Sequence, residues 1–264
     1  MGDTNELILA WFSLRNARWE ERCAAAAAGG FHGVGLNAGA FRRLDPGRDD
    51  AWFTQVALDH GVQILEVEVA RLADVPWSIE QLDLAAFVGA RHVQTIAPFE
   101  RRMAVEEGAA AIAALCAAAT ARGLRLAFEF LPPTDVPDAP TAVRWWKAAG
   151  SPDGFGLCVD SWHVFRGGGL PSLEELDPAL VTAIQFDDGP MRPTLDDYIQ
   201  DCLHYRCAPG DGEFDLDGFL ARLPYRAPVS VEVIDDDLDA LPPLEVGRVL
   251  GEATRRVLDR RVPA

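Results

Sequence analysis

The sequence predicts a single (β/α)₈ barrel, a fold in which eight parallel strands alternate with helices. Three observations lead to this fold class. The chain has 264 residues, which is close to the usual length of one such barrel. Short β-prone runs alternate with helical stretches, and several of these runs are almost entirely apolar, as strands covered on both faces should be. Because no internal repeat, linker or change of composition marks a boundary, we expect one domain over residues 1–264.

Each element of the barrel has a candidate in the sequence. The expected strands are Leu7–Trp11, Gly33–Leu36, Gln63–Val67, His92–Ile96, Arg125–Phe130, Gly156–Val159, Thr182–Phe186 and Val229–Ile234. The clearest expected helices are Trp19–Ala28, Ile79–Val88, Val105–Arg122 and Pro243–Leu258. The first three are each followed by glycine, a common signal at the end of a helix. Segments rich in Gly, Pro and Asp follow the later strands, where a barrel builds its active face.

Composition excludes several classes of function. With 24 Lys and Arg residues against 41 Asp and Glu residues, the net charge is −17, which would repel a nucleic acid. The longest apolar run, Cys23–Ala28, is too short to span a membrane. Residues 1–10 lack the basic and apolar parts of a signal peptide, so we expect a cytoplasmic protein. Five cysteines without a C-x-x-C pair predict free thiols.

Four polar side chains stand at or near the carboxyl ends of the last four expected strands. They are Glu129, Asp160, Gln185 and Glu232. An ionised carboxylate in an apolar strand is costly unless it is paired or coordinated, and three of them at one barrel mouth would repel each other. A divalent cation would remove both problems. The alternative, common for isolated strand-end acids, is that each pairs with Arg or Lys. Few cations lie within these motifs, so we favour the metal for the set of four.

The nature of the donors predicts which metal binds. All four offer oxygen, Gln185 through its amide carbonyl, and such hard ligands suit Mn²⁺ or Mg²⁺. We therefore expect one divalent ion per chain, with open positions for two oxygens of a substrate. The ion would stabilise an enediolate while a proton is removed next to a carbonyl.

Motifs of residues 125–235 resemble those of the xylose-isomerase-like barrel superfamily, and more closely its sugar phosphate isomerases and epimerases. The matching motifs are Phe-Glu-Phe-Leu-Pro around Glu129, Asp-Ser-Trp-His from Asp160, Ile-Gln-Phe-Asp-Asp-Gly-Pro from Ile184, Arg206 before Pro-Gly-Asp-Gly, and Val-Ser-Val-Glu-Val around Glu232. The resemblance implies the same four metal ligands, with Glu129 and Glu232 as the proton-transferring residues. It also implies substrate contacts from His163 and Arg206. We further expect Asp188 to bind substrate and Trp162 to form part of an apolar wall of the site. Their structural alternatives are a buried histidine, a solvated loop arginine and, for Trp162, packing in the core.

The resemblance leaves the reaction open. Many related epimerases have histidine where this chain has Gln185, whereas glutamine also occurs in related 3-dehydroshikimate dehydratases. We therefore expect a metal-dependent isomerase or epimerase acting on a sugar or a similar keto compound. The first alternative is a lyase that dehydrates a cyclic keto acid or keto-inositol, and the second is a non-catalytic barrel. A homo-oligomer is compatible with the sequence, and no glycine-rich phosphate loop is present.

Overall fold

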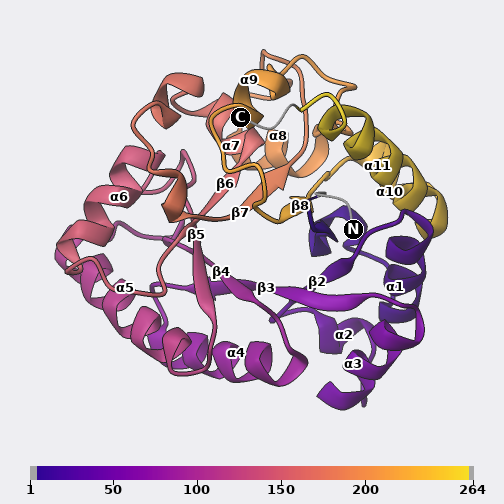
Figure 1. The fold of residues 1–264 in the computed structure, drawn as a ribbon, viewed down its shortest axis with the longest axis horizontal. Coiled ribbons are helices and arrows are strands. Elements are labelled where there is room, and N and C mark those ends of the chain that lie inside the picture. The colour runs from indigo at the N-terminus through magenta and orange to yellow at the C-terminus, as the bar shows by residue number, and fades with distance from the viewer. Residues whose placement is uncertain (1–4, 262–264) are drawn as a thin grey trace.

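The computed structural model describes residues 5–261, which form a closed barrel of eight parallel strands (Figure 1). Each strand pairs with the next along the chain, and β8 closes the barrel against β1. The predicted fold class is therefore confirmed. Residues 1–4 and 262–264, the two ends of the expected domain, lie outside the described residues.

All eight expected strands are present. Their bounds are β1 (Leu7–Leu9), β2 (Gly33–Asn37), β3 (Gln63–Arg71), β4 (His92–Ile96), β5 (Arg125–Glu129), β6 (Leu157–Asp160), β7 (Val181–Phe186) and β8 (Val229–Val231). The expected end of β1 at Trp11 is wrong, because the Trp11 N–H bonds to the Glu68 side chain and the chain turns into a 3₁₀ helix, η1 (Trp11–Leu14).

Strand β3 is longer than the sequence predicted. We expected it to end at Val67, but it continues to Arg71, and Glu68 pairs in register with Asn37 of β2. The two glutamates of this strand, Glu66 and Glu68, are fully buried inside the barrel. Buried hydrogen-bond donors satisfy three of their four carboxyl oxygens, which allows the strand to continue past Val67.

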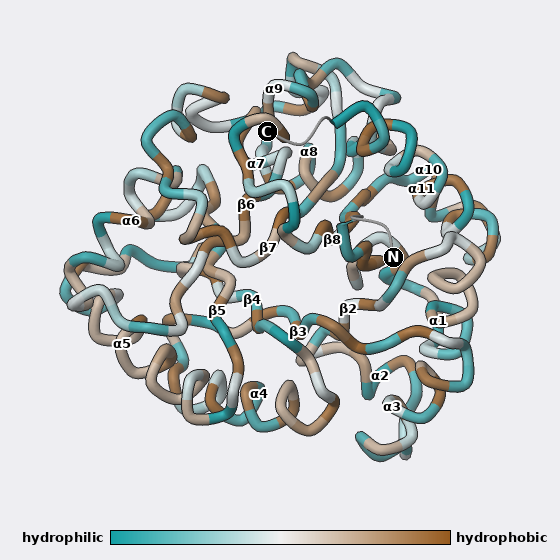
Figure 2. Tube along the Cα trace, viewed as in Figure 1, coloured by the Kyte–Doolittle hydropathy of each residue, from teal (hydrophilic) through white to brown (hydrophobic). Residues whose placement is uncertain are grey.

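Helices surround the barrel, and hydrophobic and hydrophilic residues alternate along them (Figure 2). Helices α1 (Trp19–Ala28) and α11 (Pro243–Leu258) have the expected bounds, α4 (Val75–Val88) begins about one turn early, and α5 (Val105–Thr120) ends early. The early start of α4 follows from Asp74, which accepts a hydrogen bond from the Trp77 N–H. The remaining helices are α2 (Phe41–Leu44), α3 (Asp50–Asp59), α6 (Ala139–Ala148), α7 (Ser161–Arg166), α8 (Tyr198–His204), α9 (Leu216–Leu220) and α10 (Asp236–Asp239), with 3₁₀ turns η2 (Leu170–Leu173) and η3 (Pro178–Leu180).

Helices α1 and α11 lie side by side and close the outer ring. Their approach requires glycine, because a Cβ atom at Gly247 would lie 2.1 Å from the carbonyl oxygen of Ala25. No helix among residues 5–261 is long and apolar enough to cross a bilayer. All five cysteines are free thiols, as expected.

Candidate active site

A cavity of about 220 Å³ opens at the carboxyl ends of the strands. Its polar wall is formed by Glu68, Gln94, Glu129, His163, Tyr198, Cys202, Arg206 and Glu232. Apolar side chains, among them Phe12, Phe99 and Leu131, complete the wall. Of the residues predicted from sequence, the structure therefore brings Glu129, Glu232, His163 and Arg206 together around one cavity.

Asp160 and Gln185 are buried and do not line the cavity, but they belong to the same group of polar side chains. They are register partners of β6 and β7. Asp160 Oδ1 accepts a hydrogen bond of 2.7 Å from the Trp162 N–H and so caps helix α7. The Gln185 amide oxygen accepts from the Cys158 thiol at 3.3 Å. Helix α7 begins directly after Asp160, which places His163 above the end of β6.

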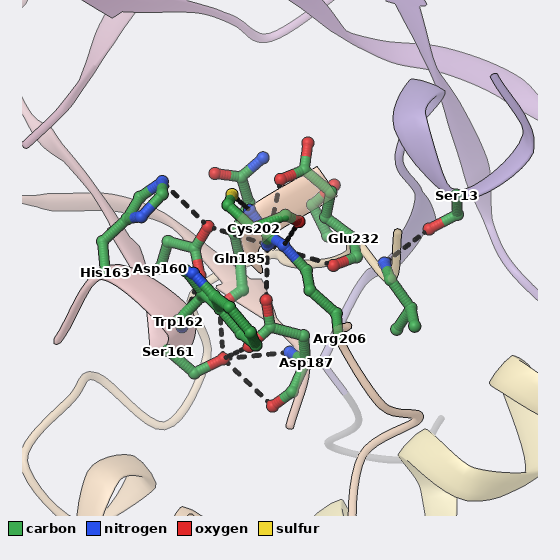
Figure 3. A network of polar contacts seen from close by, with 12 residues as sticks. Ser13, Asp160, Ser161, Trp162, His163, Gln185, Asp187, Cys202, Arg206 and Glu232 are labelled. Atoms are coloured by element: carbon green, nitrogen blue, oxygen red, sulfur yellow. Dashed lines mark hydrogen bonds and ion pairs between the residues drawn. The ribbon is translucent and has the colours of Figure 1, made fainter. Parts of the chain in front are cut away.

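Arg206 joins the acids of this site, as Figure 3 shows. Its Nη1 lies 3.1 Å from Asp160 Oδ2 and 3.1 Å from Glu232 Oε2, and it also donates to Asp187. One buried guanidinium therefore contacts three carboxyl groups. Two of the strand-end acids, Asp160 and Glu232, are therefore paired with an arginine, which was the alternative to a metal in the sequence analysis. The arginine comes from the long segment between β7 and β8, so the strand-end motifs gave no indication of the contact.

His163 is the second basic residue in contact with these acids. Its Nε2 lies 2.8 Å from Glu129 Oε1 and 3.4 Å from Asp160 Oδ2, and a short hydrogen bond joins its Nδ1 to the Tyr198 hydroxyl. Burial alone would lower the pKa of His163, but the charges of Asp160 and Glu129 outweigh it and raise the pKa above its ordinary value. Its two ring nitrogens therefore face the acids on one side and Tyr198 on the other.

The residues also fit a divalent metal. Glu129, Asp160 and His163 each offer one ligand atom, and these three atoms lie within 4.8 Å of one another. Two carboxylate oxygens and an imidazole nitrogen are ordinary ligands for such an ion. Gln185 and Glu232 stand in the same group of side chains. His163 was predicted from the sequence to contact the substrate, and its position also makes it a candidate metal ligand. The full set of four expected ligands remains a prediction.

Asp187 was missed by the sequence analysis. Its buried carboxyl group accepts from Ser161 Oγ at 2.6 Å and from Arg206. Burial, with the nearby charge of Asp160, raises the pKa of Asp187 to about 8. Asp187 directly follows β7, so the argument applied to the other strand-end acids could have found it.

Two predicted substrate residues lie outside the cavity wall. Asp188 accepts hydrogen bonds from the N–H groups of Gly189, Gly210 and Phe214 at 2.8–3.0 Å, and so fastens the segment between β7 and β8. Trp162 is fully buried, with the Arg166 guanidinium 4.2 Å from its ring. The structure does not bring either side chain to the cavity, so their substrate contacts stay predictions.

The contacts of Asp188 predict a stability effect. We expect Asp188→Ala to lower the free energy of unfolding by about 2–4 kcal/mol, because it leaves three backbone donors without their acceptor, and two of these bonds are buried. Chemical denaturation of both proteins measures this difference. Asp49→Ala, which removes a single bond to the Trp52 N–H at an exposed helix start, is the control and should cost about 1 kcal/mol. An equal loss in the two variants would contradict a fastening role for Asp188.

Comparison with known families agrees with this architecture. The family model described as "Xylose isomerase-like TIM barrel" matches residues 23–251. The chain belongs to this family. The motifs of residues 125–235 had predicted this membership, which is therefore confirmed. The family model also matches residues on the N-terminal side of these motifs, from residue 23 onward.

Individual members of the xylose isomerase-like barrels differ in their reactions. A 3-dehydroshikimate dehydratase of Pseudomonas aeruginosa is 33% identical over 158 residues, which are 55% of this chain and 24% of that protein. The chain thus spans about a quarter of the length of this curated relative. Among solved structures, the IolI protein with a bound zinc atom has a TM-score of 0.85 at 18% identity, over 98% of this chain and 100% of that chain. An L-ribulose 3-epimerase has a TM-score of 0.72 at 14% identity, over 97% and 95% of the two chains.

Proposed function

We propose that this chain is a divalent-metal-dependent isomerase or epimerase that removes a proton next to the carbonyl of a small polyhydroxylated keto compound. The observation that carries this proposal is the placement of Glu129 and Glu232. One ends β5 and the other follows β8, which are not adjacent strands, yet both side chains line one cavity. Two carboxylates can therefore approach one substrate carbon from different sides, one to take the proton and the other to return it.

The size of the cavity supports a small substrate. A cavity of about 150 Å³ admits benzene, and this one measures about 220 Å³. A monosaccharide or a single-ring keto acid is of this size class. The mixed wall also suits such a molecule, because the polar groups can bind its oxygens while Phe12, Phe99 and Leu131 cover its carbon skeleton.

Arg206 and His163 have a role in the same step. Both line the cavity, so they can hold the oxygens of the substrate and stabilise negative charge as the proton leaves. The metal is proposed to be Mn²⁺ or Mg²⁺, held by Glu129, Asp160, Gln185 and Glu232 with His163 beside them. When bound, it would act as a Lewis acid at the substrate carbonyl.

A lyase is the second candidate, and a specific observation favours it. The curated relative from P. aeruginosa is named as a 3-dehydroshikimate dehydratase. Dehydration begins with the same proton removal, after which the hydroxyl group on the next carbon takes up a proton and leaves as water, and a carbon–carbon double bond forms. We also propose a cytoplasmic location, because all five cysteines are free thiols. We propose in addition that the chain forms a homo-oligomer, which size-exclusion chromatography with light scattering would measure.

A substrate screen tests the proposal. The Mn²⁺-loaded and Mg²⁺-loaded proteins are incubated in deuterated water with L-ribulose, D-allulose and 3-dehydroshikimate. Proton NMR follows exchange next to the carbonyl and the formation of an epimer, and ultraviolet absorbance follows an unsaturated product. Epimer formation supports the first candidate, and unsaturated product supports the lyase. If a correctly folded, metal-loaded sample gives neither exchange nor product with any of the three, a non-catalytic barrel is favoured.

Gln185 offers a further test of the metal site. We expect Gln185→His to keep metal affinity within about tenfold, because an imidazole nitrogen can replace an amide oxygen as a ligand. Gln185→Leu, which has a similar size but no donor atom, should bind the ion more weakly than Gln185→His. Calorimetric titration with Mn²⁺ measures both affinities. Equal affinities in the two variants would remove Gln185 from the ligand set.

A further inference from the structure

The carboxyl group of Glu68 lies in the cavity wall and does not belong to the proposed metal ligands or proton-transferring residues. Glu68 is fully buried on β3, and its Oε1 accepts a hydrogen bond of 3.1 Å from the Trp11 N–H. Its other oxygen, Oε2, has no hydrogen-bond partner. Because the residue lines the cavity, the unpartnered oxygen is available to a molecule bound there.

The neighbouring acid on the same strand is different. Glu66 is equally buried, but its Oε1 accepts from Ser230 Oγ at 2.5 Å and its Oε2 lies 3.2 Å from His92 Nε2. Glu66 does not line the cavity. Two acids of one strand therefore share the same depth of burial, and only the one that faces the cavity has a free oxygen. Buried polar groups in proteins are normally satisfied, so the exception at Glu68 points to a ligand.

The surroundings of Glu68 favour its neutral form. None of the ion pairs between described residues includes Glu68. The charged groups that act on it are mostly of its own sign: Glu66 on β3, Glu129 on β5 and Glu232 after β8. Arg22 of α1 opposes them, but its guanidinium donates to the carbonyl groups of Trp11 and Leu14. Burial raises the pKa of Glu68 well above its ordinary value, and the charge of Glu66 raises it further.

We propose that Glu68 is a substrate-binding residue, a protonated carboxyl group whose Oε2–H donates a hydrogen bond to a carbonyl or hydroxyl oxygen of the keto substrate. The inference rests on the proposed function for the class of substrate. Strand β3 lies across the barrel from β7, so Glu68 would hold one side of the molecule while Arg206 and His163 hold the other (Figure 1). Glu68 thereby selects substrates that carry an oxygen on the β3 side.

The first experiment needs no ligand. Infrared difference spectra at neutral pH compare the wild type with Glu68→Gln, and the carbonyl stretch of a protonated carboxylic acid should be present in the wild type and missing in the variant. Glu66→Gln is the matched control, because it replaces a buried acid two residues away, and there the Glu68 band should remain. A wild type without any band that depends on Glu68 would overturn the proposal.

The second experiment measures binding by calorimetry with L-ribulose, D-allulose and 3-dehydroshikimate. Glu68→Gln keeps an oxygen for the Trp11 N–H and places an N–H donor where Oε2–H was, so affinity should change by less than about threefold. Glu68→Met fills a similar volume without a donor, and affinity should fall about tenfold or more. Circular dichroism and thermal unfolding show that each variant is folded.

The outcomes separate the two proposals. Equal affinity in Glu68→Met and wild type would overturn a binding role for Glu68. Failure of the wild type to bind any of the three compounds would contradict the proposed function, and the infrared spectra would still decide whether Glu68 presents a proton to the cavity.

Discussion

Glu129→Gln and Glu232→Gln are each expected to lower turnover by about 10²-fold or more, the usual effect of removing a general base. Glutamine keeps the size of the side chain and one carbonyl oxygen, but its amide cannot accept the proton. Both residues line the cavity, Glu129 within 2.8 Å of His163 and Glu232 within 3.1 Å of Arg206, so their positions should be preserved in the variants.

Solvent deuterium separates the proton-transfer role from a loss of binding. With a substrate found in the screen, the wild type should incorporate deuterium next to the carbonyl, and each variant should nearly cease to do so. Glu107→Gln, on the exposed face of α5, is the control and should behave as the wild type. Full exchange in both variants would exclude these glutamates as proton carriers. Loss in only one would fit a single-base mechanism and would favour the lyase.

Removal of Arg206 should have the largest effect on stability. We expect Arg206→Met to lower the free energy of unfolding by about 3–5 kcal/mol, the usual cost of leaving a buried charge without its partner. The reason is geometric, because a single nitrogen, Nη1, contacts the carboxyl groups of Asp160, Asp187 and Glu232. Methionine fills much of the volume of the arginine side chain. The decrease in the free energy of unfolding therefore reflects the lost charge more than lost packing.

The same variant links stability to metal binding. An ion held among these acids would replace part of the lost positive charge, so Mn²⁺ should raise the melting temperature of Arg206→Met more than that of the wild type. Thermal unfolding with and without Mn²⁺, and after chelation, measures both differences. Arg256→Met is the control, because Arg256 is exposed and its pairing with Asp211 should contribute about 0–1 kcal/mol. If Arg206→Met is as stable as the wild type, Arg206 does not compensate the acids.

The strand pattern and the acids of the later strands could be predicted from sequence. Helix α11 has the expected bounds because its buried residues recur at the spacing of one helix face, and β4 also has the expected bounds. Glu129, Asp160, Gln185 and Glu232 were noticeable because each interrupts or ends an apolar run. Since strands of a parallel barrel end on one face, that local signal was enough to predict that the four lie together.

Contacts between distant segments could not be predicted in this way. Arg206 pairs with Asp160 across 46 residues, and only the folded chain brings them together. Glu68 was missed because it lies beyond the expected end of β3 at Val67, and the contact of its carboxyl group with the Trp11 N–H forms only in the folded barrel. Helix α7 has six residues, which is too short to show a helical period, and its start depends on the cap from Asp160.

Metal titration tests the central claim most directly, namely that the strand-end donors hold one divalent ion. Metal-free wild type and Asp160→Ala are titrated with Mn²⁺ by calorimetry, elemental analysis of the dialysed samples gives the stoichiometry, and circular dichroism confirms that both are folded. We expect one ion per chain in the wild type and the loss of most of the affinity in Asp160→Ala. A folded wild type that binds no divalent ion, or an Asp160→Ala variant that binds it equally well, would contradict the account.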